Sequence, residues 1–447
     1  MGLRALVLGL ARSGVAAARL LAREGAEVVA VDRRRADALA PAVAELLPLG
    51  VRFALGSDEP DLLPPADLCV VSPGVPWNGP AVREMRARGA KVVGEAEYAF
   101  RFLDEPVIGV TGTNGKSTTT ALVAHLLAEA GRSVFAGGNL GTPLSERILE
   151  GGRRDVSVVE LSSYQLEGIE TFRPRVAVLT NLAPDHLDRY PSVEAYWEAK
   201  ARIFLNQREE DFAVLNADDE AVLRLHAGPA RVFRFSRREC PSEGAFDDGE
   251  AIHVVGLPES EGEERYVELS PALRGAHGRK NAMAGILAAR LLGADPGSVA
   301  RGLASFPGLP HRLQSVGTFG GAEWIDDSKA TNVESAMVAL EAFSGPVLWI
   351  AGGRGKGAPY APLRPLLPGR VRLLVTIGED GPRIRDELGD LVPTVACHTV
   401  EEAVRRAAEA VRPGEVVLFS PACASFDQFR NFEERGRTFA AHVRALG

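Results

Sequence analysis

The segment that most constrains the fold is residues 107–120, which read VIGVTGTNGKSTTT. An apolar strand candidate leads into the loop GTNGKS, and a helical pattern follows, which is the context of a phosphate-binding P-loop. In such a loop the backbone N–H groups and Lys116 hold the β- and γ-phosphates of a nucleotide, while the Ser117 hydroxyl ligates Mg²⁺. One departure is that the GxxxxGK pattern places a glycine where this chain has Val110, with Gly109 one residue earlier.

The chain has 447 residues, which is long enough for two or three domains. Short apolar strands alternate with helical stretches over residues 3–95, again after residue 105, and again towards the C-terminus, as in parallel α/β domains. Residues 231–275 carry short strand signals between acidic and Gly-rich turns, which we interpret as an antiparallel extension of the central domain. The helical stretch KNAMAGILAARLLG closes this extension, and the Pro- and Gly-rich stretch 293–312 is the second boundary candidate.

We therefore expect an α/β protein of three domains. Residues 1–104 form a Rossmann-like domain, and residues 105–297 form a P-loop ATPase-type domain with a mainly parallel sheet and a small antiparallel extension. Residues 298–447 form a second Rossmann-like domain.

Composition excludes several classes of protein. The net charge is −8 and no basic cluster with interleaved aromatic residues occurs, so we expect no nucleic-acid partner. No apolar run approaches the length of a membrane span, and the N-terminal apolar stretch is better interpreted as a first strand than as a signal sequence. The four cysteines are widely spaced, which argues against a zinc site or a disulfide scaffold. We expect a cytoplasmic protein and a monomer.

Lysine is scarce in this chain. Only six of its 51 basic residues are lysine: Lys91, Lys116, Lys200, Lys280, Lys329 and Lys356. A chain that uses arginine for most cations is expected to keep lysine where a titratable amine is needed. None of the six follows asparagine, so the chain has no NKxD guanine motif, and ATP is favoured over GTP.

A second Gly-rich turn lies near the N-terminus. Residues 9–14 read GLARSG, and Asp32 ends the next strand candidate, which resembles a dinucleotide fingerprint with Ala11 in place of the middle glycine. Such a turn favours a diphosphate at a helix N-terminus with a carboxylate nearby. A tight turn that needs glycine only for packing explains this motif equally well. Ser72, Pro73 and Gly74 end another strand on the same side.

Three further candidates follow the central strands. Glu160 closes the run DVSVVE, His186 lies in TNLAPDHLD after the next strand, and Lys200 falls in YWEAKARIF. A glutamate that ends a buried strand beside a P-loop is placed to bind a metal ion. A loop glutamate or histidine and a solvated helix lysine remain the ordinary alternatives.

Seven strings together resemble the Mur ligase family: GVTGTNGKST, ELSSYQLE, NLAPDHLDRY, GAHGRKN, PHR, DDSKATN and SPACASFDQFRNFEERG. The last two most resemble the D-glutamate-adding members. The match runs from about residue 5 to residue 437 and keeps the family order.

The resemblance implies an ATP-dependent acid–amino-acid ligase of peptidoglycan precursor synthesis. In that family ATP phosphorylates the terminal carboxylate of a UDP-muramoyl substrate, and the amine of the incoming amino acid then attacks the acyl phosphate. The implied substrates are UDP-N-acetylmuramoyl-L-alanine and D-glutamate. Two Mg²⁺ ions are implied, one held by Ser117 and Glu160 and the second near His186, Glu160 and a carbamylated Lys200. Carbamylation requires a neutral primary amine and gives an anion, which arginine does not provide.

The resemblance also assigns binding residues. ATP would contact Gly112, Thr113, Asn114, Gly115, Lys116, Ser117, Thr118, Asn281, Arg312 and Asp327. The uridine nucleotide would contact Ser13, Gly14, Asp32, Arg33, Ser72, Pro73 and Gly74, and the muramoyl-alanine arm Asn139, Gln165 and His186. The amino acid would contact Lys329, Thr331, Lys356, Ser425 and Phe432. Two positions depart from the family pattern: Gly278 replaces an asparagine, and Arg354 lies beside Lys356.

Two alternatives stay open at this stage. One is a related Mur or folylpolyglutamate-type ligase with another acceptor amino acid, although the DNPR string of diaminopimelate adders is absent. The other is a dinucleotide-sensing protein with a regulatory P-loop, for which NAD(P)H binding is expected. A non-catalytic scaffold is hard to reconcile with four lysines on motif positions.

Overall fold

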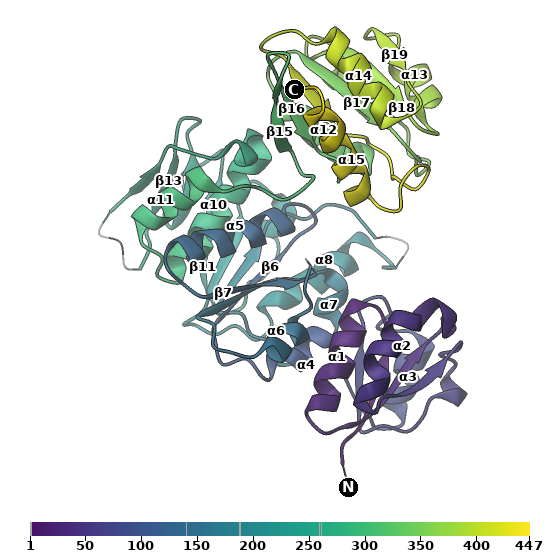
Figure 1. The fold of residues 1–447 in the computed structure, drawn as a ribbon. Coiled ribbons are helices and arrows are strands. Elements are labelled where there is room, and N and C mark those ends of the chain that lie inside the picture. The colour runs from purple at the N-terminus through teal and green to yellow at the C-terminus, as the bar shows by residue number, and fades with distance from the viewer. Residues whose placement is uncertain (1, 140, 187–188, 259, 261) are drawn as a thin grey trace. The chain divides into compact units, whose positions relative to one another are not determined.

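The computed structural model describes residues 2–139, 141–186, 189–258, 260 and 262–447 (Figure 1). The chain divides into two compact units, Met1–Glu268 with Lys280–Ala304, and Leu269–Arg279 with Ser305–Gly447. The division at 304/305 falls within the Pro- and Gly-rich stretch 293–312. The domain boundaries after residues 104 and 297 stay predictions.

The first unit begins with a five-stranded parallel sheet in the order β3-β2-β1-β4-β5. Its strands are β1 (Arg4–Leu8), β2 (Glu27–Asp32), β3 (Arg52–Leu55), β4 (Leu68–Val71) and β5 (Lys91–Gly94). Its helices are α1 (Arg12–Arg23), α2 (Ala40–Leu46), α3 (Pro80–Ala87) and α4 (Glu95–Phe100). Ala5 and Val7 pack in one cluster with α1, whereas Leu6 and Leu8 pack in another with α3. Both faces of β1 are therefore buried, which is why it is apolar almost throughout.

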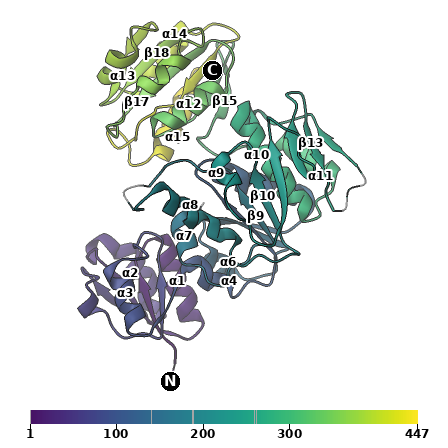
Figure 2. The same cartoon turned by 180° about the vertical axis from the view of Figure 1, so that it is seen from behind.

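The same unit contains a nine-stranded sheet in the order β14-β13-β12-β11-β10-β9-β6-β8-β7. Its strands are β6 (Val107–Thr111), β7 (Val134–Gly138), β8 (Val156–Glu160), β9 (Val176–Leu179), β10 (Phe212–Asn216), β11 (Arg231–Ser236), β12 (Gly244–Asp247), β13 (Ile252–Val255) and β14 (Glu264–Tyr266). Figure 1 labels β6, β7 and β11, and Figure 2, from behind, labels β9, β10 and β13.

The antiparallel part of this sheet is smaller than expected. β13 and β14 pair antiparallel, as do β12 and β13, but β11 pairs in parallel with both β10 and β12. The expectation of an antiparallel extension from residue 231 was therefore wrong for β11. A helix, α9 (Glu220–Leu223), lies between β10 and β11, and such a crossover returns the chain in the parallel direction.

The helices of the central region are α5 (Lys116–Glu129), α6 (Leu144–Glu150), α7 (Ser163–Glu167), α8 (Val193–Ala201), α10 (Gly275–Leu291) and α11 (Pro296–Ser305). The helix predicted in KNAMAGILAARLLG is present as α10, which begins at Gly275. The boundary candidate 293–312 is partly helical, because α11 begins at Pro296, where proline fits the first turn.

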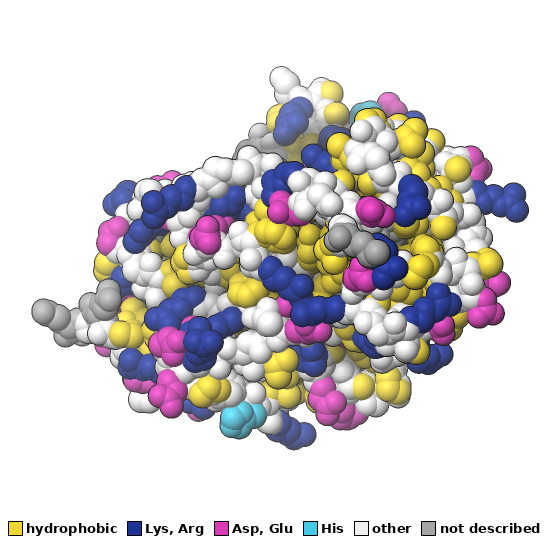
Figure 3. Space-filling view, turned by 90° about the horizontal axis from the view of Figure 1, so that it is seen from below, with side chains coloured by type: hydrophobic (Ala, Val, Ile, Leu, Met, Phe, Trp, Pro, Cys, Tyr) yellow, Lys and Arg dark blue, Asp and Glu magenta, His cyan; other side chains and the backbone are white. Residues whose placement is uncertain are grey.

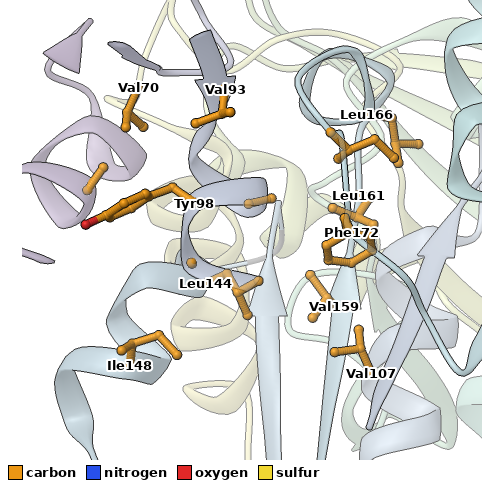
Figure 4. Packing of buried hydrophobic residues seen from close by; sticks show 14 of the residues in the cluster. Val70, Val93, Tyr98, Val107, Leu144, Ile148, Val159, Leu161, Leu166 and Phe172 are labelled. Atoms are coloured by element: carbon orange, nitrogen blue, oxygen red, sulfur yellow. The ribbon is translucent and has the colours of Figure 1, made fainter. Parts of the chain in front are cut away.

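The two sheets of the first unit share one hydrophobic core. Figure 4 shows Val70, Val93 and Tyr98 of the N-terminal part together with Leu144 and Val159 of the central part. The backbones also meet closely, since the Gly94 N–H donates to the Gly168 carbonyl at 2.8 Å. The N-terminal and central sheets therefore belong to one compact unit.

The second unit contains a six-stranded sheet in the order β15-β16-β20-β17-β18-β19. Its strands are β15 (Gln314–Phe319), β16 (Ala322–Asp326), β17 (Val347–Gly352), β18 (Val371–Ile377), β19 (Thr394–Ala396) and β20 (Val416–Phe419). Its helices are α12 (Val333–Glu341), α13 (Gly381–Leu388), α14 (Val400–Ala410) and α15 (Phe432–Arg444). All pairs are parallel except the edge hairpin of β15 with β16.

Successive residues of β17 enter opposite clusters of this unit. Trp349 and Ala351 pack with α12 and α13, while Leu348 and Ile350 pack with α14 and α15. Because side chains alternate along a strand, helices cover both faces of the sheet, as in a Rossmann-like domain. The predicted fold class is thus confirmed.

The surface of the described residues carries both signs of charge. On the face drawn in Figure 3, Lys and Arg side chains are interspersed with Asp and Glu side chains. Within the ranges described here, no helix combines the length and the apolar character that a membrane crossing requires.

Candidate active site

The predicted phosphate loop joins β6 to α5. Gly112 and Gly115 have φ values of 143° and 83°, a region that favours glycine. A Cβ at Gly112 would lie 2.0 Å from Thr180 Oγ1, so a close approach also excludes a larger residue there. Gly109 lies within β6, where a Cβ would lie 3.1 Å from Ile203 Cδ1. Gly109 is therefore a packing residue of the strand, and Gly112 and Gly115 shape the loop.

The segment after β9 holds this loop in place. The Asn114 N–H donates to Asn181 Oδ1 at 2.9 Å, and Thr180 Oγ1 donates to the Asn114 carbonyl at 2.6 Å. The Thr113 N–H donates to the Asn181 carbonyl at 3.0 Å. In the first turn of α5, Ser117 is half-buried and Thr118 is buried. The predicted ATP contacts Gly112 to Gly115 therefore lie in a loop that is hydrogen-bonded to the segment after β9, whereas Lys116, Ser117 and Thr118 lie in the first turn of α5.

Two lysine amines meet at one carbonyl oxygen of the loop. Lys116 Nζ donates to the Gly112 carbonyl at 2.9 Å and to the Thr113 carbonyl at 2.7 Å. Lys200 Nζ, from α8, donates to the same Gly112 oxygen at 2.7 Å and is 1% exposed. Burial, followed by repulsion from Lys116, lowers the pKa of Lys200 to about 6. At neutral pH Lys200 is thus mostly the neutral, nucleophilic amine.

Glu160 lies beside the loop at the end of β8, next to Val110 of β6 in the sheet. Its carboxylate is 1% exposed, and Oε1 accepts a hydrogen bond from Asn139 Nδ2 at 2.7 Å. Oε2 is buried and has no hydrogen-bond partner among the described residues. A buried carboxylate oxygen without a donor fits a bound cation.

The described ranges contain no group of three His, Cys, Asp or Glu side chains arranged to hold a metal ion. Mg²⁺ usually keeps several waters and binds through one or two carboxylates plus substrate phosphates, so a complete protein cage is not required. Within the described part of the chain, Glu160 Oε2 has no hydrogen-bond partner, and this oxygen suits Mg²⁺ together with the Ser117 hydroxyl near the start of α5.

His186 lies in an aromatic cluster. Its φ is +53°, and its ring centroid lies 5.0 Å from that of Tyr164 and 5.7 Å from that of Tyr196. A positive φ in a non-glycine residue is uncommon and often marks a functional loop. Leu187 and Asp188 of the NLAPDHLDRY string lie outside the described residues.

The sequence interpretation missed Tyr196. Its ring lies 4.6 Å from Lys200 Nζ, its hydroxyl lies 3.4 Å from Thr113 Oγ1, and its side chain is buried. A signal for it was present, because Tyr196 precedes Lys200 by four residues on a predicted helix and thus shares its face. Gln165 is the third residue of α7, and its Oε1 accepts from the N–H of the N-cap residue Ser162 at 2.9 Å in a capping box.

The N-terminal Gly-rich turn borders a pocket of about 200 Å³. Lining residues include the predicted uridine contacts Asp32, Arg33, Ser72 and Gly74. Burial opposes ionisation of Asp32, but hydrogen bonds from Arg34 and from the Leu10 N–H outweigh it and lower its pKa to about 2. Both carboxylate oxygens of Asp32 thus already accept hydrogen bonds, Oδ1 from Arg34 and Oδ2 from Arg34 and the Leu10 N–H. Ser13 is half-buried in the first turn of α1.

Gly14→Ala is expected to lower the free energy of unfolding by about 1–3 kcal/mol and to weaken uridine nucleotide binding. A Cβ at this position would lie 1.7 Å from the Gly9 carbonyl oxygen, so the turn must open. Denaturant unfolding and a UDP titration measure both effects. Gly345→Ala is the control, because its Cβ would meet no atom within 4 Å. Equal stability of the two variants would contradict the steric argument.

Asn281 of α10 lies against the phosphate loop, since a Cβ at Gly115 would come within 2.5 Å of its Oδ1. Its Oδ1 also accepts a hydrogen bond from Thr119 Oγ1 at 3.4 Å. The departure at Gly278 has a packing reason within the second unit. A Cβ there would lie 2.2 Å from the Leu273 carbonyl oxygen, so asparagine would not fit without a backbone shift.

In the second unit, Arg312 lies between two residues with positive φ, His311 at 60° and Leu313 at 43°. Arg312 Nε is buried and has no hydrogen-bond partner among the described residues, which fits an anionic ligand such as phosphate. Asp327 accepts from Leu313 N–H at 3.2 Å and from Ser420 Oγ at 2.7 Å. Burial raises the pKa of Asp327 to about 7.

The predicted amino-acid contacts also lie in the second unit. Lys329 Nζ lies 5.7 Å from the ring centroid of Phe432, and the Thr331 N–H donates to the Lys329 carbonyl at 2.9 Å. Ser328 Oγ donates to the Phe432 carbonyl at 2.9 Å. The structure thus brings Lys329, Thr331 and Phe432 together.

The loops of Lys356 and Ser425 meet through backbone hydrogen bonds. The N–H groups of Arg354 and Ala424 each donate to the other residue's carbonyl at 2.9 Å. Ser425 is 2% exposed, whereas Lys356 is exposed. The Arg354 side chain pairs with Glu379 at 2.8 Å, so its guanidinium is already engaged.

Three domain families match this chain in order. Residues 3–94 match the Mur ligase MurD-like N-terminal domain, residues 110–289 the Mur ligase middle domain, and residues 311–423 the Mur ligase glutamate ligase domain. The middle-domain match contains the phosphate loop, Glu160 and Lys200. The glutamate-ligase match contains Arg312 and Lys329.

Two relatives match over almost their whole length, and both are described as UDP-N-acetylmuramoylalanine–D-glutamate ligase. The one from Anaeromyxobacter dehalogenans is 53% identical, with 98% of this chain and 96% of the relative covered. The one from Myxococcus xanthus is 51% identical, with 100% and 99% covered. The fold also resembles the MurF ligase of Thermotoga maritima in complex with ADP, at 18% identity and a TM-score of 0.62, covering 94% of this chain and 96% of that one. This chain belongs to the Mur ligase family.

Proposed function

We propose that the protein catalyses the ATP-dependent addition of D-glutamate to UDP-N-acetylmuramoyl-L-alanine, a step of peptidoglycan precursor synthesis. The observation that carries this proposal is the 53% identity, over nearly the full length, with a ligase described by that reaction. The same similarity extends through all three matched domains, so it includes the parts that would bind each substrate.

The chemistry requires activation of a carboxylate, which is a poor electrophile at neutral pH. The γ-phosphoryl group of ATP is transferred to the terminal carboxylate of UDP-N-acetylmuramoyl-L-alanine, which gives an acyl phosphate and ADP. The amine of D-glutamate then attacks the acyl carbon and loses a proton. The tetrahedral intermediate collapses as the bond to the phosphate oxygen breaks, leaving an amide and inorganic phosphate.

The phosphate loop would bind the nucleotide, with Lys116 near the transferred phosphoryl group and Asn281 near the base. Ser117 and Glu160 would hold one Mg²⁺, and His186 and a carbamylated Lys200 would lie near a second. Mg²⁺ supplies positive charge that offsets the negative charge on the phosphoryl oxygens. The low pKa of Lys200 supports carbamylation, because a neutral amine is the form that adds CO₂.

The loops of the second unit that carry Lys329 and Lys356 would receive the acceptor amino acid. Lys329 and Lys356 are ammonium donors for carboxylates, and Thr331 and Ser425 offer hydroxyl groups. Phe432 contacts Lys329 and would border the aliphatic part of the amino acid. Arg312 and Asp327 would face ATP, consistent with Arg312 Nε having no hydrogen-bond partner in the described part of the chain.

The uridine nucleotide would bind at the N-terminal pocket, against Ser13, Gly14, Asp32, Arg33 and the loop of residues 72–74. Asn139, Gln165 and His186 would contact the muramoyl-alanine arm. We also propose domains of residues 1–104, 105–297 and 298–447, a monomeric state, and a cytoplasmic location, where ATP is available.

The test is phosphate release with ATP, Mg²⁺ and UDP-N-acetylmuramoyl-L-alanine in the presence of a panel of amino acids. We expect release with D-glutamate and background release with L-glutamate, meso-diaminopimelate, L-lysine and L-alanine. Release with a different amino acid would contradict the acceptor assignment, and release with none would contradict the ligase. An NADH titration tests the alternative of a dinucleotide-sensing protein. That alternative predicts NADH binding, whereas the ligase does not.

A further inference from the structure

The side chain of Arg189 joins the N-terminal part of the first unit to the loop that carries His186. Nη1 donates to the Pro73 carbonyl at 2.9 Å, and Nη2 donates to the Val75 carbonyl at 3.0 Å. Nη2 also contacts Glu167 Oε2 at 3.4 Å. The side chain is 16% exposed, so these contacts are largely shielded from water.

On the N-terminal side, the contacted carbonyls belong to the loop after β4. This loop lines the 200 Å³ pocket through Ser72, Gly74 and Val75. Val75 Cγ2 would lie 2.9 Å from a Cβ placed on Gly9, so the loop also packs against the Gly-rich turn. The two hydrogen bonds from Arg189 therefore fix one wall of the predicted uridine pocket.

On the central side, Arg189 is tied to His186 in two ways. Its own N–H donates to the His186 carbonyl at 3.0 Å. Its guanidinium carbon lies 3.8 Å from the ring centroid of Tyr164, and Tyr164 in turn packs against His186 at 5.0 Å. A displacement of the guanidinium thus changes the support of both the uridine pocket and His186.

A guanidinium is required for this arrangement. Its planar group donates in two directions from one plane and stacks on an aromatic ring at the same time. An ammonium group is a compact donor that would keep the charge opposite Glu167 but lose the stack and one of the two carbonyls. Arg189→Lys therefore removes the stack and one carbonyl contact but preserves the positive charge.

We propose that Arg189 is a positioning residue that couples the uridine pocket to His186, so that a filled pocket holds His186 in its active orientation. This inference rests on the proposed function, in which the pocket binds the UDP part of the substrate. Arg189 itself contacts the loop carbonyls and Tyr164 and acts through them.

The first experiment compares Arg189→Lys and Arg189→Gln with Arg23→Lys. Arg23 is a matched control, since its Nη1 donates to the Ile148 carbonyl at 2.7 Å and links the same two parts of the unit away from the pocket. We expect the two Arg189 variants to raise the Kd for UDP-N-acetylmuramoyl-L-alanine, measured calorimetrically, by about tenfold to a hundredfold. The KM for ATP should stay near the parent value and the Tm should fall only slightly, since the lost hydrogen bonds are partly shielded. The control should keep the parent Kd.

The second experiment is a double-mutant cycle with His186→Ala. Arg189→Lys is also expected to lower kcat, because His186 loses part of its support. If Arg189 acts through His186, this loss should shrink at least about threefold in the His186→Ala background. Additive losses, or a parent-like Kd in Arg189→Lys, would overturn the coupling. A lower Tm with equal changes in every KM would also overturn it in favour of a purely structural role. A parent protein that binds no UDP substrate would overturn the proposed function itself, and that result is read before any variant is made.

Discussion

Lys200→Ala is expected to lower kcat by on the order of 10²–10³-fold, which is typical for loss of one preorganised charged group at a phosphoryl- or acyl-transfer site. The buried amine shares the Gly112 carbonyl with Lys116, so the substitution removes one of the two amines that contact the phosphate loop there. Short carboxylic acids such as acetate or formate should restore part of the activity, because they replace the anion that a carbamate provides.

Carbamylation of Lys200 is expected to depend on pH. The pKa is lowered to about 6, so the amine is protonated below that value and neutral above it. The carbamate is therefore expected above about pH 6 and should disappear as the pH falls below that value, as followed by the carbonyl carbon signal with ¹³C-labelled bicarbonate. The signal should be absent in Lys200→Ala and unchanged in Lys91→Ala, whose ammonium is exposed and pairs with Glu170. Full activity of Lys200→Ala would contradict the role of the lysine, and failed rescue would contradict the carbamate.

The fold could be predicted largely from local patterns. Buried parallel strands such as β6 and β8 are apolar runs, and polar or charged side chains follow where these strands end. The carboxyl ends of such strands meet at one edge of a sheet. Glu160 could therefore be placed near the phosphate loop from its position alone. The direction of β11 could not be assigned, because the residues of one strand have the same pattern whether its neighbours run parallel or antiparallel. The helix α9, which returns the chain so that β11 runs parallel to β10, has only four residues and therefore carries little sequence signal.

The fine structure of the site depends on contacts that no local pattern encodes. Lys200 and the Gly112 carbonyl are 88 residues apart, and Arg189 is 116 residues from Pro73. Their meeting is decided by how α8 and the loop before it pack on the two sheets. The small number of lysines nevertheless indicated Lys200. A lysine kept in a chain that otherwise uses arginine suggests a need for a titratable amine, and this inference does not depend on packing. The position of Tyr196 was partly predictable, because its spacing of four residues from Lys200 places both on one helix face. Its contact with Thr113 was not predictable from the sequence.

Glu160→Gln is expected to lower the activity without lowering the free energy of unfolding. It should lower Mg²⁺-dependent phosphate release by on the order of 10²–10³-fold, since the amide replaces a metal-binding oxygen with a donor. Nucleotide affinity measured without Mg²⁺ should change little, because the phosphate loop holds its shape through Gly112, Asn114 and Thr180.

The same substitution should leave the free energy of unfolding unchanged or raise it by about 1 kcal/mol, because a buried carboxylate oxygen without a donor costs stability in the ligand-free protein. Glu97→Gln is the matched control. Glu97 is equally buried but accepts from the N–H groups of Glu170, Thr171 and Phe172, each at 2.9 Å. Its replacement should lower the free energy of unfolding by about 1–3 kcal/mol and leave Mg²⁺ dependence intact. Denaturant unfolding and Mg²⁺ titrations of both variants decide the point, because a structural Glu160 would destabilise like Glu97, whereas a carboxylate kept for a cation would not.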